Sequence, residues 1–136
     1  MALVAAMLVQ IGWTLGLLFY MGRSRAASVR AGEVKIRDVA LSGDAWPDRI
    51  KAISNNYSNQ FETPVLFYVL CGLALYVGAT HIGMVIAAWL YVLSRIGHTL
   101  VHTGSNHVMT RFRIFVAGVF ALIAMWTMLV VRVAGI

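Results

Sequence analysis

Four apolar stretches separated by polar connections dominate the chain, at about residues 2–20, 59–79, 82–103 and 110–132. Each is close to the roughly 20 residues that a helix needs to cross a bilayer. None shows the alternation of barrel strands, and a helix in lipid satisfies all of its own backbone polar groups. The pattern therefore predicts an all-α integral membrane protein, a single domain of four transmembrane helices.

Composition agrees with this pattern. Hydrophobic residues make up 60% of the 136-residue chain and charged residues only 12%, which is far from the balance of a soluble domain. Four spans and one long polar connection, at about residues 21–57, use the whole length. The single cysteine, Cys71, lies inside an apolar stretch, so we expect neither a disulfide nor a zinc site.

The basic residues predict the topology. Most of them lie in the 21–57 connection, Arg111 and Arg113 open the fourth span, and the connection between the second and third spans has none. The positive-inside rule then places the first and third connections in the cytoplasm and both termini outside it, against the single dissenting charge of Arg132. The net charge of +6 predicts contact with anionic lipid and not with nucleic acid.

Polar residues enter the second span in a helical pattern. We expect one unbroken helix from about Asp48, on which Asn55, Asn59 and Glu62 follow at i, i+4 and i+7 on one face. Pro64 cannot donate to the helix, so it leaves a carbonyl free there and can kink the chain. A carboxylate near the bilayer is costly, which indicates a partner or a ligand.

The third span carries a matching stripe. Its polar members recur at i, i+4, i+7 and i+11 and reach the same predicted cytoplasmic end, namely Tyr91, Arg95, His98 and His102. Arg111 and Arg113 begin the fourth span at that end as well. Two polar stripes at one depth should meet, and the resulting pocket would be basic and suited to an anionic ligand.

Plainer interpretations stay open. Glu62 and Arg95 can form a buried ion pair that only fixes helix register. Asn55 and Asn59 can join helices through hydrogen bonds, and His98 can be a satisfied core residue. The arginines of the fourth span can anchor the interface alone. Haem or metal is disfavoured because the histidines of the third span share one helix face, so no metal site is expected.

The motifs AWPDRI, NQFETPVLFY and SRIGH, together with four spans and a basic first connection, resemble the membrane-associated proteins in eicosanoid and glutathione metabolism, the MAPEG family, and in particular a bacterial branch. The resemblance covers nearly the whole chain. Its strongest local matches are the Asn-x-x-Glu of Asn59 and Glu62 and the Arg-x-x-His of Arg95 and His98.

The resemblance implies a homotrimer in a membrane, with a bacterial inner membrane as the expected location. It implies glutathione as co-substrate, bound between subunits near the cytoplasmic face, and a lipophilic electrophile or lipid hydroperoxide as the second substrate. Arg111 would support the thiolate as the catalytic residue, with Arg113 as its alternative. The remaining expected glutathione contacts are Asn59, Glu62, Arg49, Lys51, Asn55, Arg95 and His98.

Some positions depart from the family pattern. Asn55 and Ser58 stand where arginines are usual, and Thr63 and His102 replace tyrosines. The alternative hypothesis is therefore a non-catalytic lipid-binding or scaffolding protein with a degraded glutathione site. A proton-coupled transporter that uses Glu62 is a third hypothesis, which the neighbouring Arg95 disfavours.

Overall fold

The computed structural model describes residues 1–135, and all regular secondary structure in this part of the chain is helical, without strands. The helices are α1 (Ala2–Arg30), η1 (Ile36–Val39), α2 (Asp48–Ser58), η2 (Asn59–Phe61), α3 (Thr63–Tyr76), α4 (Ile82–Thr103) and α5 (Val108–Ala134), where η marks a short 3₁₀ helix. The all-α prediction is thus confirmed.

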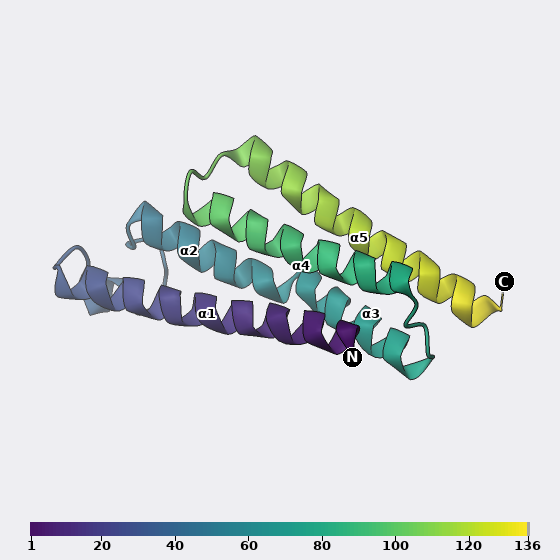
Figure 1. Cartoon of the computed structure of the whole chain (residues 1–136). Coiled ribbons are helices and arrows are strands. Elements are labelled where there is room, and N and C mark those ends of the chain that lie inside the picture. The colour runs from purple at the N-terminus through teal and green to yellow at the C-terminus, as the bar shows by residue number, and fades with distance from the viewer. Residues whose placement is uncertain (136) are drawn as a thin grey trace.

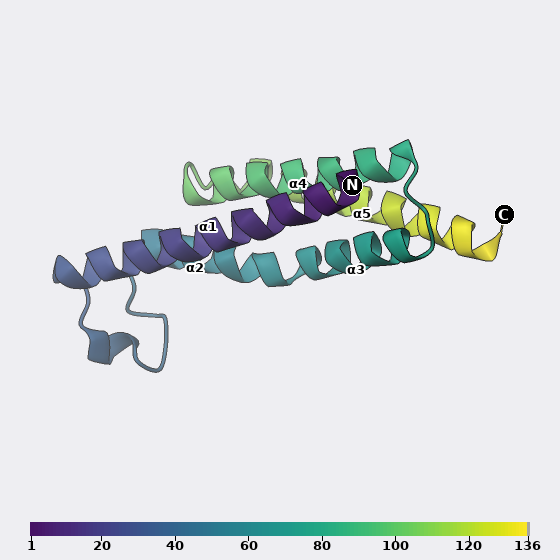
Figure 2. The same cartoon turned by 60° about the horizontal axis from the view of Figure 1, so that its bottom comes forward.

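The helices run side by side along one direction, with α4 at the centre (Figures 1 and 2). α4 contacts α1, α2, α3 and α5, and α5 packs on both α4 and α3. The first residue and the end of α5 lie toward one end of the bundle. The α1–α2 connection and the α4–α5 turn lie at the opposite end, which is called the loop end below.

Three helices, α1, α4 and α5, are long and apolar enough to cross a membrane. α3 has 14 residues, which at 1.5 Å per residue gives about 21 Å, short of the roughly 30 Å of hydrocarbon. α2 and α3 follow one another along nearly the same line (Figure 2). The second crossing therefore stays a prediction that needs η2 and the end of α2 to complete its length.

α1 continues well beyond its apolar stretch and ends at Arg30. It ends there because Gly32 adopts a positive φ of 73°, which only glycine tolerates readily. The amide of Gly32 donates to the Val29 carbonyl and that of Glu33 to the Ser28 carbonyl, the pattern of a Schellman motif. The residues between α1 and α2 are thus 31–47, and they include the short helix η1.

The expected unbroken second helix is wrong. α2 ends at Ser58, η2 follows, and Glu62 leaves the helical region with φ −95° and ψ −101° before α3 begins. Pro64 lies in the first turn of α3, where its missing N–H costs least. It would have had to donate to the Gln60 carbonyl in a continuous helix, so the chain breaks before it.

The core changes character along the bundle. Toward the chain termini it is apolar, with Tyr91 stacked on Phe67 at a ring-centroid distance of 4.8 Å. Met84 and Met125 are fully buried in the same cluster. Toward the loop end, by contrast, the buried side chains are mostly polar: Gln10, Asn56, Gln60, Arg95, His98, Thr99 and His102. This second region is called the polar core below.

Candidate functional site

The polar core is built mainly on one face of α4. Arg95, His98 and His102 are between 2% and 5% exposed, so the stripe predicted from their spacing does face inward. α4 forms this face because its apolar and polar inward positions share one helical period. The spacing therefore correctly indicated which polar residues of α4 are buried.

A chain of hydrogen bonds links α1, α2 and α4 through the polar core. Gln10 Nε2 donates to Gln60 Oε1 at 3.1 Å, and Gln60 Nε2 donates to the Asn56 carbonyl at 3.2 Å. The Asn56 amide then contacts His102 Nδ1 at 3.3 Å and accepts from the Thr99 hydroxyl at 3.0 Å. These bonds hold three helices in one register, because each buried polar group depends on the next.

Sequence reasoning missed Asn56 of α2 and Gln60 of η2 as the buried polar residues and proposed Asn55 and Asn59 instead. Asn55 is exposed and Asn59 is half-buried. A signal was available, because Asn56 and Gln60 continue the helical spacing of Ile53, which is fully part of the buried face. The polar stripe of Asn55, Asn59 and Glu62 therefore lies beside the polar core and not inside it.

Arg95 is the most unusual member of the polar core. Its side chain is 2% exposed, it donates from Nη2 to the Asn59 carbonyl at 3.1 Å, and its buried Nε has no hydrogen-bond partner. Among residues 1–135 no carboxylate lies within ion-pair distance of it, because the three ion pairs found all lie in the α1–α2 connection or on α2. The core thus holds a cation without a counter-charge.

The ion pair between Glu62 and Arg95, one of the alternative interpretations, is not formed within residues 1–135. Glu62 is exposed, although it is close enough for its charge to act on Arg95. Arg95 instead fills the helix break, since in an unbroken helix the Asn59 carbonyl would accept from the Thr63 amide. The Tyr91 hydroxyl donates to the Thr63 hydroxyl at 3.0 Å, so α4 holds the chain on both sides of the break.

His98 lies next to this cation and has an orphan atom of its own. Its Nδ1 is buried without a hydrogen-bond partner, and its ring centroid lies 5.5 Å from that of His102 and 6.2 Å from that of Phe115. Arg95 and Arg111 are both close enough to interact electrostatically with it. The imidazole is thus buried among positive charge and keeps one free polar atom.

The two arginines at the start of α5 differ in placement. Arg111 is half-buried and donates from Nη1 to Asn106 Oδ1 at 3.0 Å. Arg113 is exposed and makes no side-chain hydrogen bond among the contacts of the described residues. Of the two predicted candidates, Arg111 is therefore the one beside the polar core.

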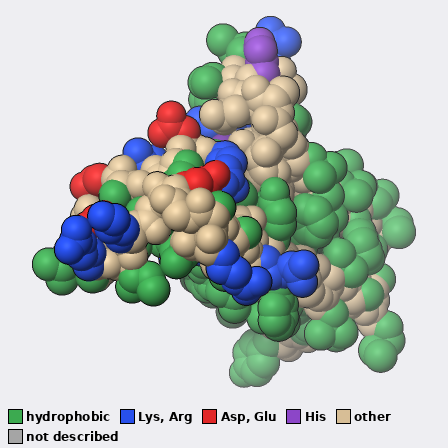
Figure 3. All heavy atoms as spheres, turned by 90° about the vertical axis from the view of Figure 1, so that its left-hand side faces the viewer, with side chains coloured by type: hydrophobic (Ala, Val, Ile, Leu, Met, Phe, Trp, Pro, Cys, Tyr) green, Lys and Arg blue, Asp and Glu red, His purple; other side chains and the backbone are tan. Residues whose placement is uncertain are grey.

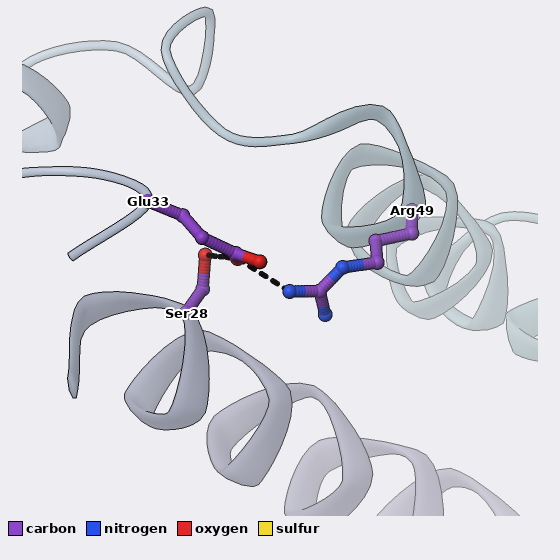
Figure 4. A network of polar contacts seen from close by, with 3 residues as sticks. All are labelled: Ser28, Glu33 and Arg49. Carbon is purple, nitrogen blue, oxygen red and sulfur yellow. Dashed lines mark hydrogen bonds and ion pairs between the residues drawn. The ribbon is translucent and has the colours of Figure 1, made fainter. Parts of the chain in front are cut away.

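Arg49 is engaged at the loop end. Its guanidinium contacts the Glu33 carboxylate, which also accepts a hydrogen bond of 2.6 Å from the Ser28 hydroxyl (Figure 4). The Ser28 hydrogen bond, helped by the Arg49 charge, lowers the pKa of Glu33 below its ordinary value of 4.5. Lys51 pairs with Asp48 at 3.6 Å. Neither basic residue of α2 reaches the polar core.

The described residues bring no three His, Cys, Asp or Glu side chains together as a metal site. What they do assemble is an unpaired guanidinium, an imidazole with a free nitrogen, and an exposed carboxylate at the helix break. Such a set can hold a ligand that carries both an anionic group and an ammonium group. Arg111 adds a further cation at the same depth.

The family comparison agrees with the residues. The model of the MAPEG family matches residues 3–131, which is nearly the whole chain. Searches of curated proteins and of solved structures find no match.

Proposed function

Because the chain belongs to the MAPEG family, which includes glutathione-dependent transferases and peroxidases, we propose that it is a membrane transferase or peroxidase of this kind. Its second substrate would be a lipophilic electrophile or a lipid hydroperoxide that enters from the bilayer. Three apolar helices of spanning length and the family together make it an integral membrane protein.

The observation that carries this proposal is the buried, unpaired guanidinium of Arg95. A buried charge without a counter-ion is costly, and an ionisable residue in a membrane protein core indicates a functional partner. Arg95 also lies next to the helix break that ends in Glu62. A peptide with carboxylates and an amine, such as glutathione, would supply the missing charges to both residues.

The remaining residues take roles that follow from their chemistry. Asn59 and Glu62 would bind the peptide backbone and the amine, and Arg95 would bind a carboxylate, with His98 beside it. Arg111 would stabilise the thiolate, because a nearby cation lowers the pKa of a thiol. The thiolate sulfur would then form a bond to the electrophilic carbon while the leaving group departs with its electron pair.

A homotrimer would complete this site. Glu62 and Asn55 lie on the outside of a single chain, where a neighbouring subunit can cover them. Arg49 and Lys51 would contribute to carboxylate binding only if the ligand extends along α2 toward the loop end. In this proposal the loop end faces the cytoplasm of a bacterial inner membrane and both termini lie on the other side.

The test is thermal unfolding of the purified protein in detergent with glutathione and with S-hexylglutathione. A ligand at 100 times its dissociation constant adds about 2.7 kcal/mol of stability, which gives a measurable shift. We expect the shift to disappear in Glu62→Gln and to remain in Asp38→Asn, an exposed acid of the α1–α2 connection. Absence of a shift in the parent at millimolar ligand would contradict the proposal.

A specific observation favours one alternative. The positions where the family usually has arginines hold Asn55 and Ser58, which are exposed and uncharged, and Arg49 is already paired with Glu33. A non-catalytic lipid-binding or scaffolding protein would need none of these cations. That alternative is favoured if glutathione does not change the unfolding temperature while lipid remains bound after purification.

A further inference from the structure

A small polar cavity lies where the polar half of α1, the 31–47 connection and α2 meet. Its volume is about 290 Å³, and its wall includes the side chains of Arg25, Asp44, Trp46, Lys51 and Asn55. No residue of α3, α4 or α5 lines it, so it is separate from the polar core. It belongs to the loop end, where the charged side chains of both signs gather (Figure 3).

Arg25 is the central residue of this cavity. Its Nη2 donates to the Ser54 hydroxyl at 2.9 Å, and its guanidinium carbon lies 5.4 Å from the centre of the Trp46 ring. Its Nε is buried and has no hydrogen-bond partner. Arg25 takes part in none of the ion pairs within residues 1–135. The cavity wall therefore contains a preoriented cation that belongs to no ion pair within the described residues.

The depth of the cavity matches the headgroup layer of a membrane. Arg25 follows the last residue of the first apolar stretch, Tyr20, by five positions, which places it about 7.5 Å further along the helix. The polar layers on the two sides of a bilayer together add some 10–15 Å to its hydrocarbon thickness. A tryptophan such as Trp46 is typical of this layer.

We propose that this cavity binds the phosphodiester headgroup of a membrane phospholipid. Arg25 and Lys51 would bind the phosphate, since basic pockets between helices at a membrane surface recognise lipid phosphates. Asn55 and Asp44 would bind the hydroxyl or ammonium of the headgroup.

The rest of the lipid also has a place in the structure. Leu18 and Ile11 precede Arg25 by seven and fourteen residues on the same face of α1 and are 40% and 42% exposed. They offer an apolar track for an acyl chain that starts at the cavity. The cavity volume of about 290 Å³ is at the lower limit for pockets that enclose whole organic ligands, which suits a headgroup.

The experiment is native mass spectrometry of the delipidated full chain, titrated with dioleoyl phosphatidylglycerol and dioleoyl phosphatidylethanolamine. We expect one phospholipid per subunit to bind the parent, and Arg25→Gln to weaken this binding about fivefold to tenfold. Arg23→Gln is the matched control, because Arg23 is an exposed arginine at the same end of α1 and does not line the cavity. It should bind lipid like the parent.

Three results would overturn the proposal. An equal loss of phospholipid affinity in Arg23→Gln and Arg25→Gln would mean that basic residues attract lipid in general and that the cavity is not a specific site. Glycerol 3-phosphate binding as tightly as the phospholipid would mean a soluble phosphate ligand. Displacement of the phospholipid by glutathione, one for one, would assign the cavity to the proposed glutathione site.

A second variant protects the test from a folding defect. Lys51 is part of the cavity wall and its side chain is 41% exposed, so Lys51→Gln should fold even if Arg25→Gln does not. Lys51→Gln should also bind the phospholipid more weakly than the parent does. Binding as tight as that of the parent would contradict the proposal. Lys51 and Asn55 are also expected glutathione contacts, so glutathione and lipid are titrated separately, and a glutathione shift without lipid binding, or the reverse, separates the two proposals.

Discussion

The two halves of the bundle core are equally buried and yet organised in opposite ways. Around Met125 and Phe67 the packing is apolar, and the hydroxyl of Tyr91, which bonds to Thr63, is a polar exception. Around Asn56 and Arg95 each side chain has specific partners, and several buried atoms have none. Apolar burial is non-directional, whereas polar burial is favourable only when every group is satisfied. The apolar half thus supplies stability, and the polar half keeps unsatisfied groups that a ligand can satisfy.

The largest effect on stability is expected from the apolar half. Met125→Ala removes a fully buried side chain and should lower the free energy of unfolding by about 2–5 kcal/mol. Reversible unfolding in mixed detergent micelles measures this loss. The glutathione dissociation constant should not change, and a change larger than about twofold would break the division between the two halves.

Asn56→Ala should have the next largest effect and lower the free energy of unfolding by about 1–3 kcal/mol. The substitution leaves Thr99 and His102 without the side chain that they contact in the core. Its neighbour Asn55 is exposed, so Asn55→Ala is the matched control and should change stability by less than about 0.5 kcal/mol. Similar losses from both variants would show that the asparagine assignment on α2 is wrong.

Arg95→Met sharpens the comparison most. The variant removes an unpaired buried charge and one hydrogen bond, so we expect stability to stay within about 1 kcal/mol of the parent or to rise. The thermal shift with glutathione should be lost. A destabilisation of several kcal/mol would mean that Arg95 is a structural residue whose charge is satisfied in the assembled protein.

The smallest effect concerns the Glu33, Ser28 and Arg49 contact. Because the folded-state pKa of Glu33 is lowered from 4.5, its contribution to stability is present above about that pH and is lost as pH falls through the lower folded value. The unfolding temperature of the parent should therefore decrease as the pH is lowered below about 4.5. Glu33→Gln should remove part of this fall, and an identical pH profile would exclude the contact as a stabilising one.

The sequence allowed α4 to be predicted well and α2 poorly, for a physical reason. On α4 the polar stripe and the apolar face repeat with the same helical period, so only one orientation buries both. On α2 the stripes of Asn55 and Asn56 differ by one residue, or about 100° around the helix. Polarity alone does not show which asparagine is buried. The buried apolar residues Ile50 and Ile53 define the inward face of α2, and Asn56 lies on that face. The break at Glu62 follows from Pro64, but its hydrogen-bond partner Arg95 is distant in the sequence and could not be identified from it.

Arg95 donates a hydrogen bond to the carbonyl of Asn59 at the helix break, and this contact has an evolutionary consequence. Proline at position 64 separates α2 from α3 and leaves the Asn59 carbonyl for a donor from α4. A residue with an N–H at position 64 would favour a continuous helix, in which the Thr63 amide takes that carbonyl and Arg95 loses its hydrogen bond. The two positions are therefore coupled, and we expect lineages that lose the proline to change the arginine as well.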